Sequence, residues 1–148
     1  HERGIIDSNI YNDGTGASVL TGGRRFSDSC STDIFIHMDG QEVFKFAVKS
    51  VPTAIETLLH NNNMDINDVD KFILHQANVR IIESVAKRLK ADKDKFPVNL
   101  NEYGNTSSAS IPILLDELNR NGSLKQGEKL VLAGFGAGLS WGSILLVW

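Results

Sequence analysis

The sequence has a single cysteine, three prolines and no apolar run that approaches the length of a membrane-spanning helix. A helix that crosses a bilayer needs about 20 consecutive apolar residues, so we predict no membrane association. One cysteine excludes an internal disulfide, which suits a reducing compartment, and we expect a cytoplasmic protein. The first residues also lack the basic-then-apolar pattern of a secretion signal.

Composition limits the class of protein further. Of the 148 residues, 41% are hydrophobic and 22% are charged, and the net charge of −3 gives no general reason to expect nucleic acid as a partner. The length fits one domain, residues 1–148, and no internal repeat or low-complexity segment divides it. The chain starts without a methionine, almost directly in a strand-like run, which is typical of a fragment or a processed piece.

Hydrophobic periodicity predicts a layered α/β domain. Short apolar runs indicate strands, and apolar residues at three-to-four spacing indicate helices. The expected strands are 4–10, 34–38, 72–74, 96–100, 129–133 and 143–148, and the expected helices are about 42–59, 79–89 and 111–118. Because strands and helices alternate, we expect a mostly parallel or mixed sheet of about five strands flanked by helices. The last two strands are almost continuously apolar and should be buried on both faces.

Three local features add to this prediction. Pro52 lies inside the long helical pattern and removes a backbone donor, which predicts a kink or two abutting helices. Ser110 is the expected N-cap of the helix that follows it, with Pro112 in the first turn. Residues 21–33 are polar and poor in apolar anchors, so we expect a mobile surface loop there.

Polar side chains gather in three segments next to these strands. Segment 72–78 (FILHQAN) ends a buried strand in a histidine and two amides directly before a helix. Segment 102–110 (EYGNTSSAS) is a loop that contains an asparagine, and segment 134–142 (GFGAGLSWG) is a glycine-rich turn between two apolar strands. Open α/β sheets usually place their chemistry where a strand ends in polar residues at a helix start.

Each segment also has a simpler structural interpretation. A lone histidine at the end of a strand is more often structural than catalytic, and Asn105 beside Gly104 suits a tight turn. The glycines of the third segment would by themselves permit a closely packed turn. That turn lacks the following helix that a dinucleotide site requires, which excludes a Rossmann-type site. The combination of the three segments is what favours a functional site.

In this order the three segments resemble the C-terminal half of β-ketoacyl-acyl-carrier-protein synthase III, a condensing enzyme of the thiolase fold. The resemblance runs from Gly4 to Trp148. It implies that His75 and Asn105 donate N–H groups to the enolate oxygen formed when a malonyl thioester loses carbon dioxide. Donors fixed at a developing oxyanion can each lower a barrier by ~3–4 kcal/mol. The histidine would have to be neutral and protonated on the correct nitrogen.

The resemblance also implies binding residues. The backbone N–H of Ala137 would face the acyl oxyanion; the family more usually has glycine there, and alanine suits if its φ is negative. The coenzyme A and pantetheine site would include Gly40, Gln41 (where the family often has asparagine), Phe44, Ala77, Asn78, Arg80 and Phe135. Acyl carrier protein would meet the basic residues Lys45, Arg80, Lys87 and Arg88. For Lys87 and Arg88 alone, a solvated helix face is the simpler interpretation.

The lone cysteine does not complete this site. Acyl transfer of this kind needs a thiolate, typically at a helix N-terminus, whereas Cys30 lies in a Ser/Asp-rich loop and is predicted to be an incidental surface thiol. The resemblance places the nucleophile in an N-terminal half that these residues do not match.

We therefore expect the C-terminal half of an enzyme that joins acyl-CoA to malonyl-acyl carrier protein and releases carbon dioxide and coenzyme A. The coenzyme A thioester would be its substrate, with no further cofactor and no metal. This half alone is expected to be inactive, and its partners would be the missing N-terminal half and, when full length, a second copy in a homodimer. Two alternatives stay open: a non-catalytic module that binds coenzyme A or acyl carrier protein, and half of a related polyketide starter synthase.

Overall fold

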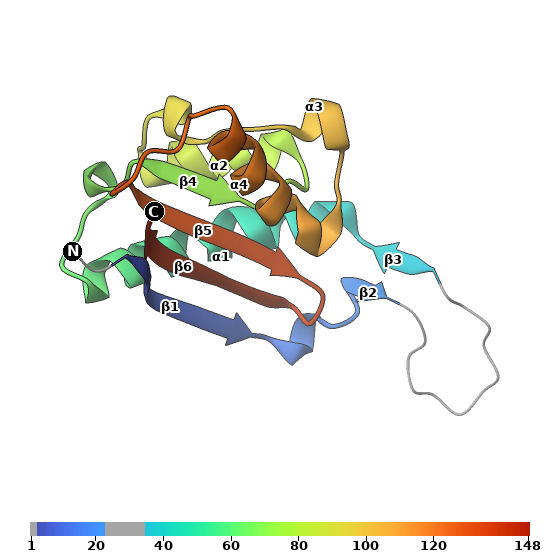
Figure 1. The fold of residues 1–148 in the computed structure, drawn as a ribbon. Helices are drawn as coiled ribbons and strands as arrows, with labels where there is room; N and C mark the ends of the chain where they lie inside the picture. Colours follow the sequence, from blue (N-terminus) through green and yellow to red (C-terminus); the bar gives the residue numbers. More distant parts are fainter. Residues whose placement is uncertain (1–2, 23–34) are drawn as a thin grey trace.

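The computed structural model describes residues 3–22 and 35–148 (Figure 1). Its strands are β1 (Gly4–Asn12), β2 (Leu20–Gly22), β3 (Ile36–Met38), β4 (Lys71–Leu74), β5 (Lys129–Gly136) and β6 (Ser140–Val147). Its α-helices are α1 (Gly40–Asn61), α2 (Val79–Leu89), α3 (Leu100–Tyr103) and α4 (Ser110–Arg120). None of the helices in these two ranges is long and apolar enough to cross a membrane.

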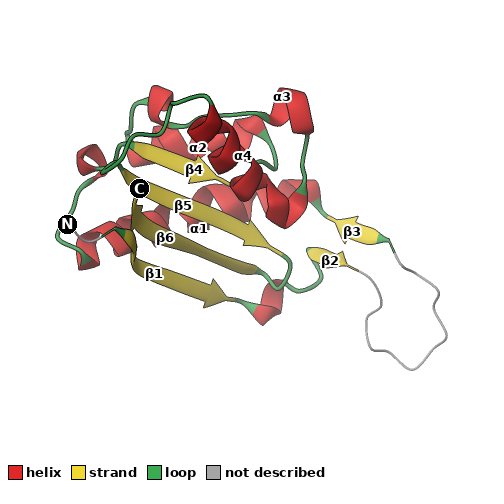
Figure 2. Ribbon diagram, in the orientation of Figure 1, coloured by secondary structure: helices red, strands yellow, loops and turns green. Residues whose placement is uncertain are grey.

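A mixed four-stranded sheet in the order β1-β6-β5-β4 forms the centre of the domain (Figure 2). β4 and β5 run parallel, and the other two pairings are antiparallel. β2 and β3 pair separately as a two-stranded antiparallel ribbon. The predicted mixed sheet with flanking helices is confirmed. It has four strands rather than about five.

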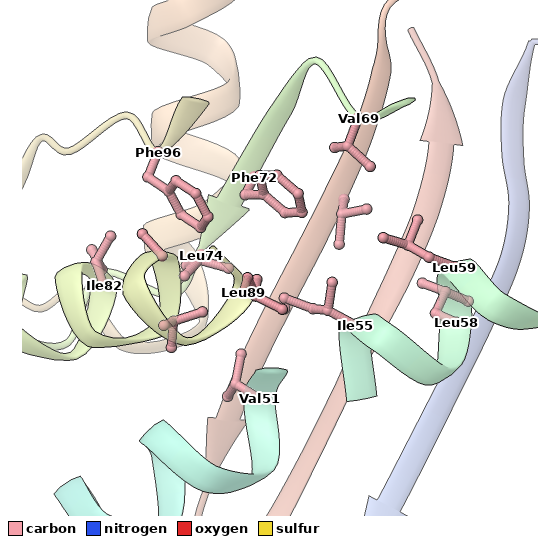
Figure 3. Packing of buried hydrophobic residues seen from close by; sticks show 14 of the residues in the cluster. Val51, Ile55, Leu58, Leu59, Val69, Phe72, Leu74, Ile82, Leu89 and Phe96 are labelled. Atoms are coloured by element: carbon pink, nitrogen blue, oxygen red, sulfur yellow. The ribbon is translucent and has the colours of Figure 1, made fainter. Parts of the chain in front are cut away.

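Helices cover both faces of this sheet. Phe72 and Leu74 of β4 pack in a cluster with α1 and α2, whereas Ile73 between them packs in a second cluster with α4. Figure 3 shows the first cluster, in which side chains from α1, α2 and β4 meet over the sheet. Leu130 and Val131, successive residues of β5, are both fully buried, and the end of β6 is buried in the same way. Burial on both faces is confirmed for these residues, whereas Leu132 of β5 and Ile144 of β6 are only partly buried and line a hollow beside α4.

α1 is a single helix with Pro52 inside it. The Asp39 carboxylate caps its start by accepting the N–H groups of Gln41 and Glu42, each at 3.0 Å. The apolar face that packs on the sheet continues through Pro52, which is itself buried. Packing of this face outweighs the one backbone hydrogen bond that the proline removes. The alternative of two abutting helices is therefore wrong.

The predicted strand at 96–100 is also wrong. Phe96 is buried because its ring stacks on Phe72, with the centroids 4.7 Å apart, and α3 begins at Leu100. Segment 96–100 has the apolar spacing of a strand because this connecting segment packs its apolar residues against α2 and β4.

The start of α4 differs from prediction as well. Ala109 occupies the N-cap position, and Ser110 is the first helical residue, with its hydroxyl bonded to groups outside the helix. In the predicted loop 21–33, Thr21 and Gly22 belong to β2. Residues 23–33, with Cys30 among them, lie outside the described residues.

At Gly142, β6 leaves no room for a side chain against β1. A Cβ at this position would lie 2.5 Å from the backbone oxygen of Asn9, whereas a Cβ at Gly136 would meet nothing within 4 Å. We predict that Gly142→Ala lowers the free energy of unfolding by about 1–3 kcal/mol, because one strand must shift. The matched Gly136→Ala should stay within about 1 kcal/mol of the parent. Urea unfolding measures both, and equal values would contradict the close approach.

Candidate active site

His75 directly follows β4, where the parallel pair β4–β5 ends. Its backbone N–H donates to the oxygen of Ala133 at 2.8 Å, so the residue still continues the strand ladder. The side chain is half-buried and lines a hollow of about 390 Å³. The histidine thus lies at the carboxyl edge of the parallel pair, where open α/β sheets bind their ligands.

The hollow brings together parts of all three polar segments. It lies beside the β5–β6 hairpin, the end of β4 and the start of α4. Its lining residues are Ile10, His75, Ser107, Ser108, Ser110, Ile111, Gly134, Phe135, Gly136, Ser140, Trp141 and Gly142. Two of the sequence-predicted site residues, His75 and Phe135, are among them.

One side-chain hydrogen bond holds the His75 ring, and a buried network supports its partner. Its Nδ1 lies 2.7 Å from Oγ of Ser110, and the same oxygen accepts the N–H of Gln76 at 3.2 Å. Gln76 is fully buried; its Nε2 donates to the Leu74 oxygen at 2.8 Å, and its Oε1 accepts the N–H of Asn99 at 3.2 Å. The end of β4 and the start of α4 are therefore joined through groups that water does not reach.

An aromatic wall completes the site. The Phe135 ring meets the His75 ring nearly edge-on, with the centroids 5.5 Å apart. Phe46 of α1 packs edge-on against Phe135 at 6.3 Å and against Trp141 at 5.3 Å. Trp141 in turn stacks on Tyr11 of β1 at 5.5 Å. Edge-on and offset-stacked rings of this kind contribute beyond their buried area, which favours a rigid apolar boundary.

Asn105 lies in the exposed loop between α3 and α4. Its Oδ1 accepts the N–H of Ser107 at 2.9 Å, which fixes the orientation of the amide. Its Nδ2 has no hydrogen bond to any described residue, so it is available as a donor. Ser107 and Ser108 line the hollow, whereas Asn105 itself does not. The structure brings the loop beside His75, and the catalytic role of Asn105 stays a prediction.

Ala137 lies in the exposed turn between β5 and β6. The described non-glycine residues with positive φ are Asn63, Lys90 and Ser107. Ala137 is not one of them, so its φ is negative, which is the condition under which an alanine can replace the more usual glycine here. Its neighbour Gly136 lines the hollow, and the role of the Ala137 N–H at an oxyanion stays a prediction.

The starts of α1 and α2 lie together at a second place. The Arg80 guanidinium carbon lies 5.8 Å from the centroid of the Phe44 ring, a cation–π contact between the two helices. Asn78 caps α2 by accepting the Arg80 N–H at 2.9 Å. The remaining residues of the predicted coenzyme A set are adjacent in the chain: Ala77 before α2, and Gly40 and Gln41 in the first turn of α1. Their contact with coenzyme A stays a prediction.

The predicted carrier-protein residues lie on two helices. Lys45 of α1 pairs with Glu42, with its Nζ 2.7 Å from Oε1, and this carboxylate raises the pKa of the Lys45 ammonium. Arg80 is in the first turn of α2, and Lys87 and Arg88 are exposed in its last turn. The structure gives Lys45 an anionic neighbour that any acidic partner would have to replace.

Ser110 and Trp141 are among the lining residues of the hollow that sequence reasoning did not assign to the site. The sequence pattern suggested only helix capping for Ser110. A histidine at the end of a buried strand needs a buried hydrogen-bond partner, and that need was the signal that could have pointed to this serine. Trp141 lies in the third segment, but its place beside Phe46 depends on the packing of α1 against the sheet, which no local pattern contains.

The same architecture is found in known proteins. Residues 59–148 match the family described as 3-oxoacyl-[acyl-carrier-protein (ACP)] synthase III C terminal. The β-ketoacyl-[acyl-carrier-protein] synthase III of Clostridium tetani is 44% identical over 162 residues, which cover 100% of this chain and 48% of that protein. The synthase III structure from Thermus thermophilus has a TM-score of 0.90 at 38% identity, over 99% of this chain and 46% of that one. The priming β-ketosynthase of the R1128 polyketide pathway has a TM-score of 0.87 at 34% identity, over 97% and 45%.

The fold is therefore that of a thiolase-like condensing enzyme. More narrowly, the chain belongs to the C-terminal family of 3-oxoacyl-acyl-carrier-protein synthase III. It spans about half the length of the curated relatives that it matches. The predicted family and fold are confirmed, while the roles of individual residues stay predictions.

Burial lowers the pKa of His75 below its ordinary value of 6.5, because desolvation disfavours the imidazolium form. The side chain is therefore neutral near pH 7. We predict that NMR titration of the His75 ring gives a pKa below about 6.5.

The same shift predicts a pH dependence of stability. Because the pKa of His75 is lower in the folded than in the unfolded chain, the contribution of its burial to the free energy of unfolding is fully present above the unfolded pKa. It is lost as the pH falls from the unfolded pKa through the folded one. Acidification below about 6.5 should therefore reduce the unfolding free energy of the parent more than that of His75→Gln. A parallel decline in both proteins would contradict the lowered pKa.

Proposed function

We propose that this chain supplies the decarboxylation and oxyanion groups of a condensing enzyme that extends an acyl group with a malonyl thioester. The observation that supports it is the placement of His75. A neutral, half-buried imidazole lies at the carboxyl edge of a parallel strand pair, in a hollow where all three polar segments meet. Neutral N–H donors fixed in a partly dry pocket are what an enolate oxygen requires.

In the proposed reaction, acyl-CoA first transfers its acyl group to a cysteine of an N-terminal half, and coenzyme A leaves. The carboxylate of malonyl-acyl carrier protein then leaves as carbon dioxide, and the electron pair of the broken C–C bond forms an enolate. His75 and Asn105 donate N–H groups to the enolate oxygen. The enolate carbon attacks the acyl thioester, the Ala137 N–H stabilises the resulting oxyanion, and the cysteine thiolate is expelled as β-ketoacyl-acyl carrier protein forms.

The partner in this proposal is an N-terminal half that bears the cysteine. Asn9 of β1 bonds to the Ala54 oxygen of α1, so β1 directs its other face, with Ser8 and Ile10, away from that helix. Ile10 is 78% exposed, and the same side of the sheet is hollowed over Ile111, Leu132 and Ile144. Uncovered apolar surface at a site edge favours a protein partner. The relatives are about twice as long as this chain, which favours their other half as that partner.

We further infer a cytoplasmic enzyme that is a homodimer when both halves are present. Similarity to the priming β-ketosynthase of a polyketide pathway supports a second candidate, half of a polyketide starter synthase. Both candidates use the same His75 and Asn105 chemistry. They differ in the acyl group, so the acyl-CoA that supports condensation distinguishes them.

The catalytic assignment predicts the effect of removing either donor. With the N-terminal half of a relative supplied, His75→Ala and Asn105→Ala should each reduce kcat for malonyl-thioester decarboxylation by about 100- to 1000-fold, since each removes one oxyanion donor. His60→Ala and Asn101→Ala replace exposed residues of the same types and should retain activity. Full condensation activity in either site variant would overturn its assigned role.

The binding assignment predicts a contribution from Arg80. Titration calorimetry with coenzyme A should show that Arg80→Ala weakens binding by about tenfold, because a charged hydrogen-bond donor to phosphate is lost. The effect should shrink as salt concentration rises. Arg120→Ala, which removes an arginine paired with Asp116 on α4, is the matched control. Equal affinity in the two variants would argue against a coenzyme A site at the start of α2.

A further inference from the structure

The hydroxyl of Ser110 lies between two groups of the candidate site. Its oxygen is 2.7 Å from Nδ1 of His75 and 3.2 Å from the backbone nitrogen of Gln76. Ser110 is 2% exposed, so its polar atoms have no ready access to water. Its hydrogen bonds must therefore be made within the protein.

The numbers of donors and acceptors fix the direction of one hydrogen bond and favour one direction for the other. The Gln76 backbone N–H can only donate, so Ser110 Oγ accepts there. A hydroxyl has one proton to donate, and a buried hydroxyl that keeps it unpaired loses about 1–3 kcal/mol. Among the described residues, the only other hydrogen-bond partner of Ser110 Oγ is His75 Nδ1.

We propose that Ser110 is a positioning residue that donates its hydroxyl proton to His75 Nδ1 and so fixes the proton of the neutral ring on Nε2. The tautomer of a histidine is set by the hydrogen bond that its other nitrogen makes. Nδ1 is then an acceptor occupied inside the protein, and Nε2–H is the donor left for the hollow that the ring lines.

The acceptor role of Ser110 is itself held in place. Gln76 is fully buried and accepts the N–H of Asn99, and the Asn99 side chain donates to Oε2 of Glu117 on α4 at 2.8 Å. Ser110 begins that same helix. The helix start, the strand end and the connecting segment are thus fastened together, so the hydroxyl has little freedom to turn away from the ring.

This inference rests on the proposed function only for its catalytic consequence. An Nε2–H donor facing the hollow is the form that an enolate oxygen would need. The tautomer itself is a property of the chain and is measured without substrate or partner.

The test is NMR of the His75 ring nitrogens in the full chain, at a pH well above imidazole titration. We expect one tautomer, with the proton on Nε2 and with the Nδ1 shift displaced as for a hydrogen-bonded acceptor. In Ser110→Ala the Nδ1 shift should move to the value of a free acceptor, or the second tautomer should appear. Ser108→Ala is the matched control, because Ser108 lines the same hollow but has no hydrogen bond to His75.

A proton on Nδ1 in the parent chain would overturn the proposal, and so would an Nδ1 shift that is unchanged in Ser110→Ala. If the alanine variant does not fold, Ser110→Thr keeps a hydroxyl and Ser110→Cys weakens it. The parent shift should then persist in the threonine variant and change in the cysteine variant. Identical shifts in both would also overturn the proposal.

A second readout separates this inference from the proposed function. With an N-terminal half supplied, Ser110→Ala should lower kcat for malonyl-thioester decarboxylation by about tenfold with little change in KM. If the parent shows the expected tautomer and shift change but no decarboxylation, the proposed function fails and the role of Ser110 stands. If decarboxylation occurs but the Nδ1 shift does not depend on Ser110, the proposed function stands and the role of Ser110 fails.

Discussion

The parallel pairing of β4 with β5 is the constraint on which the site depends. Its register places Leu74 opposite Ala133, and the N–H of His75 extends the ladder by one more bond. Successive buried residues of both strands point into opposite clusters, so a slip of one residue would exchange the side chains of the two hydrophobic clusters. Packing therefore fixes the register, and the register fixes where the histidine leaves the sheet. The β5–β6 hairpin then returns Phe135 and Trp141 to the same edge.

The second constraint is the attachment of α4 to the end of β4. Helix α4 covers the face of the sheet opposite α1 and α2, and its first residue reaches the strand end through Ser110 and Gln76. A fully buried glutamine is costly unless its amide is satisfied, and here both of its side-chain polar atoms are bonded to backbone groups. The amide next to His75 in the sequence thus has a structural role. It fastens the scaffold on which the histidine is presented.

Much of the fold follows from local patterns, and the failures have physical causes. Helix α2 has its predicted bounds because Asn78 caps its start and eleven residues keep a strong amphipathic period. The strand prediction for 96–100 failed because a connecting segment that packs Phe96 on Phe72 has the same apolar pattern as a short strand. Ser110 is a residue type that often caps helices, but its hydroxyl bonds to His75, a contact distant in the sequence, and does not cap the helix. Of the site, the histidine and Phe135 were predictable from the motif. Ile10 reaches the hollow only through the pairing of β1 with β6, which depends on long-range contacts.

Burial and hydrogen bonding at His75 act in the same direction. Desolvation lowers its pKa and removes the charged form, and a neutral imidazole must then place its one proton on one of two nitrogens. A half-buried ring without a polar partner would keep both tautomers available. The Ser110 hydroxyl already accepts the N–H of Gln76, and its own proton would stay unpaired in a buried place unless Nδ1 accepts it, so the hydroxyl favours the tautomer with the proton on Nε2. The sheet therefore decides where the histidine lies, its burial decides its charge, and the first residue of α4 decides which nitrogen faces the hollow as a donor.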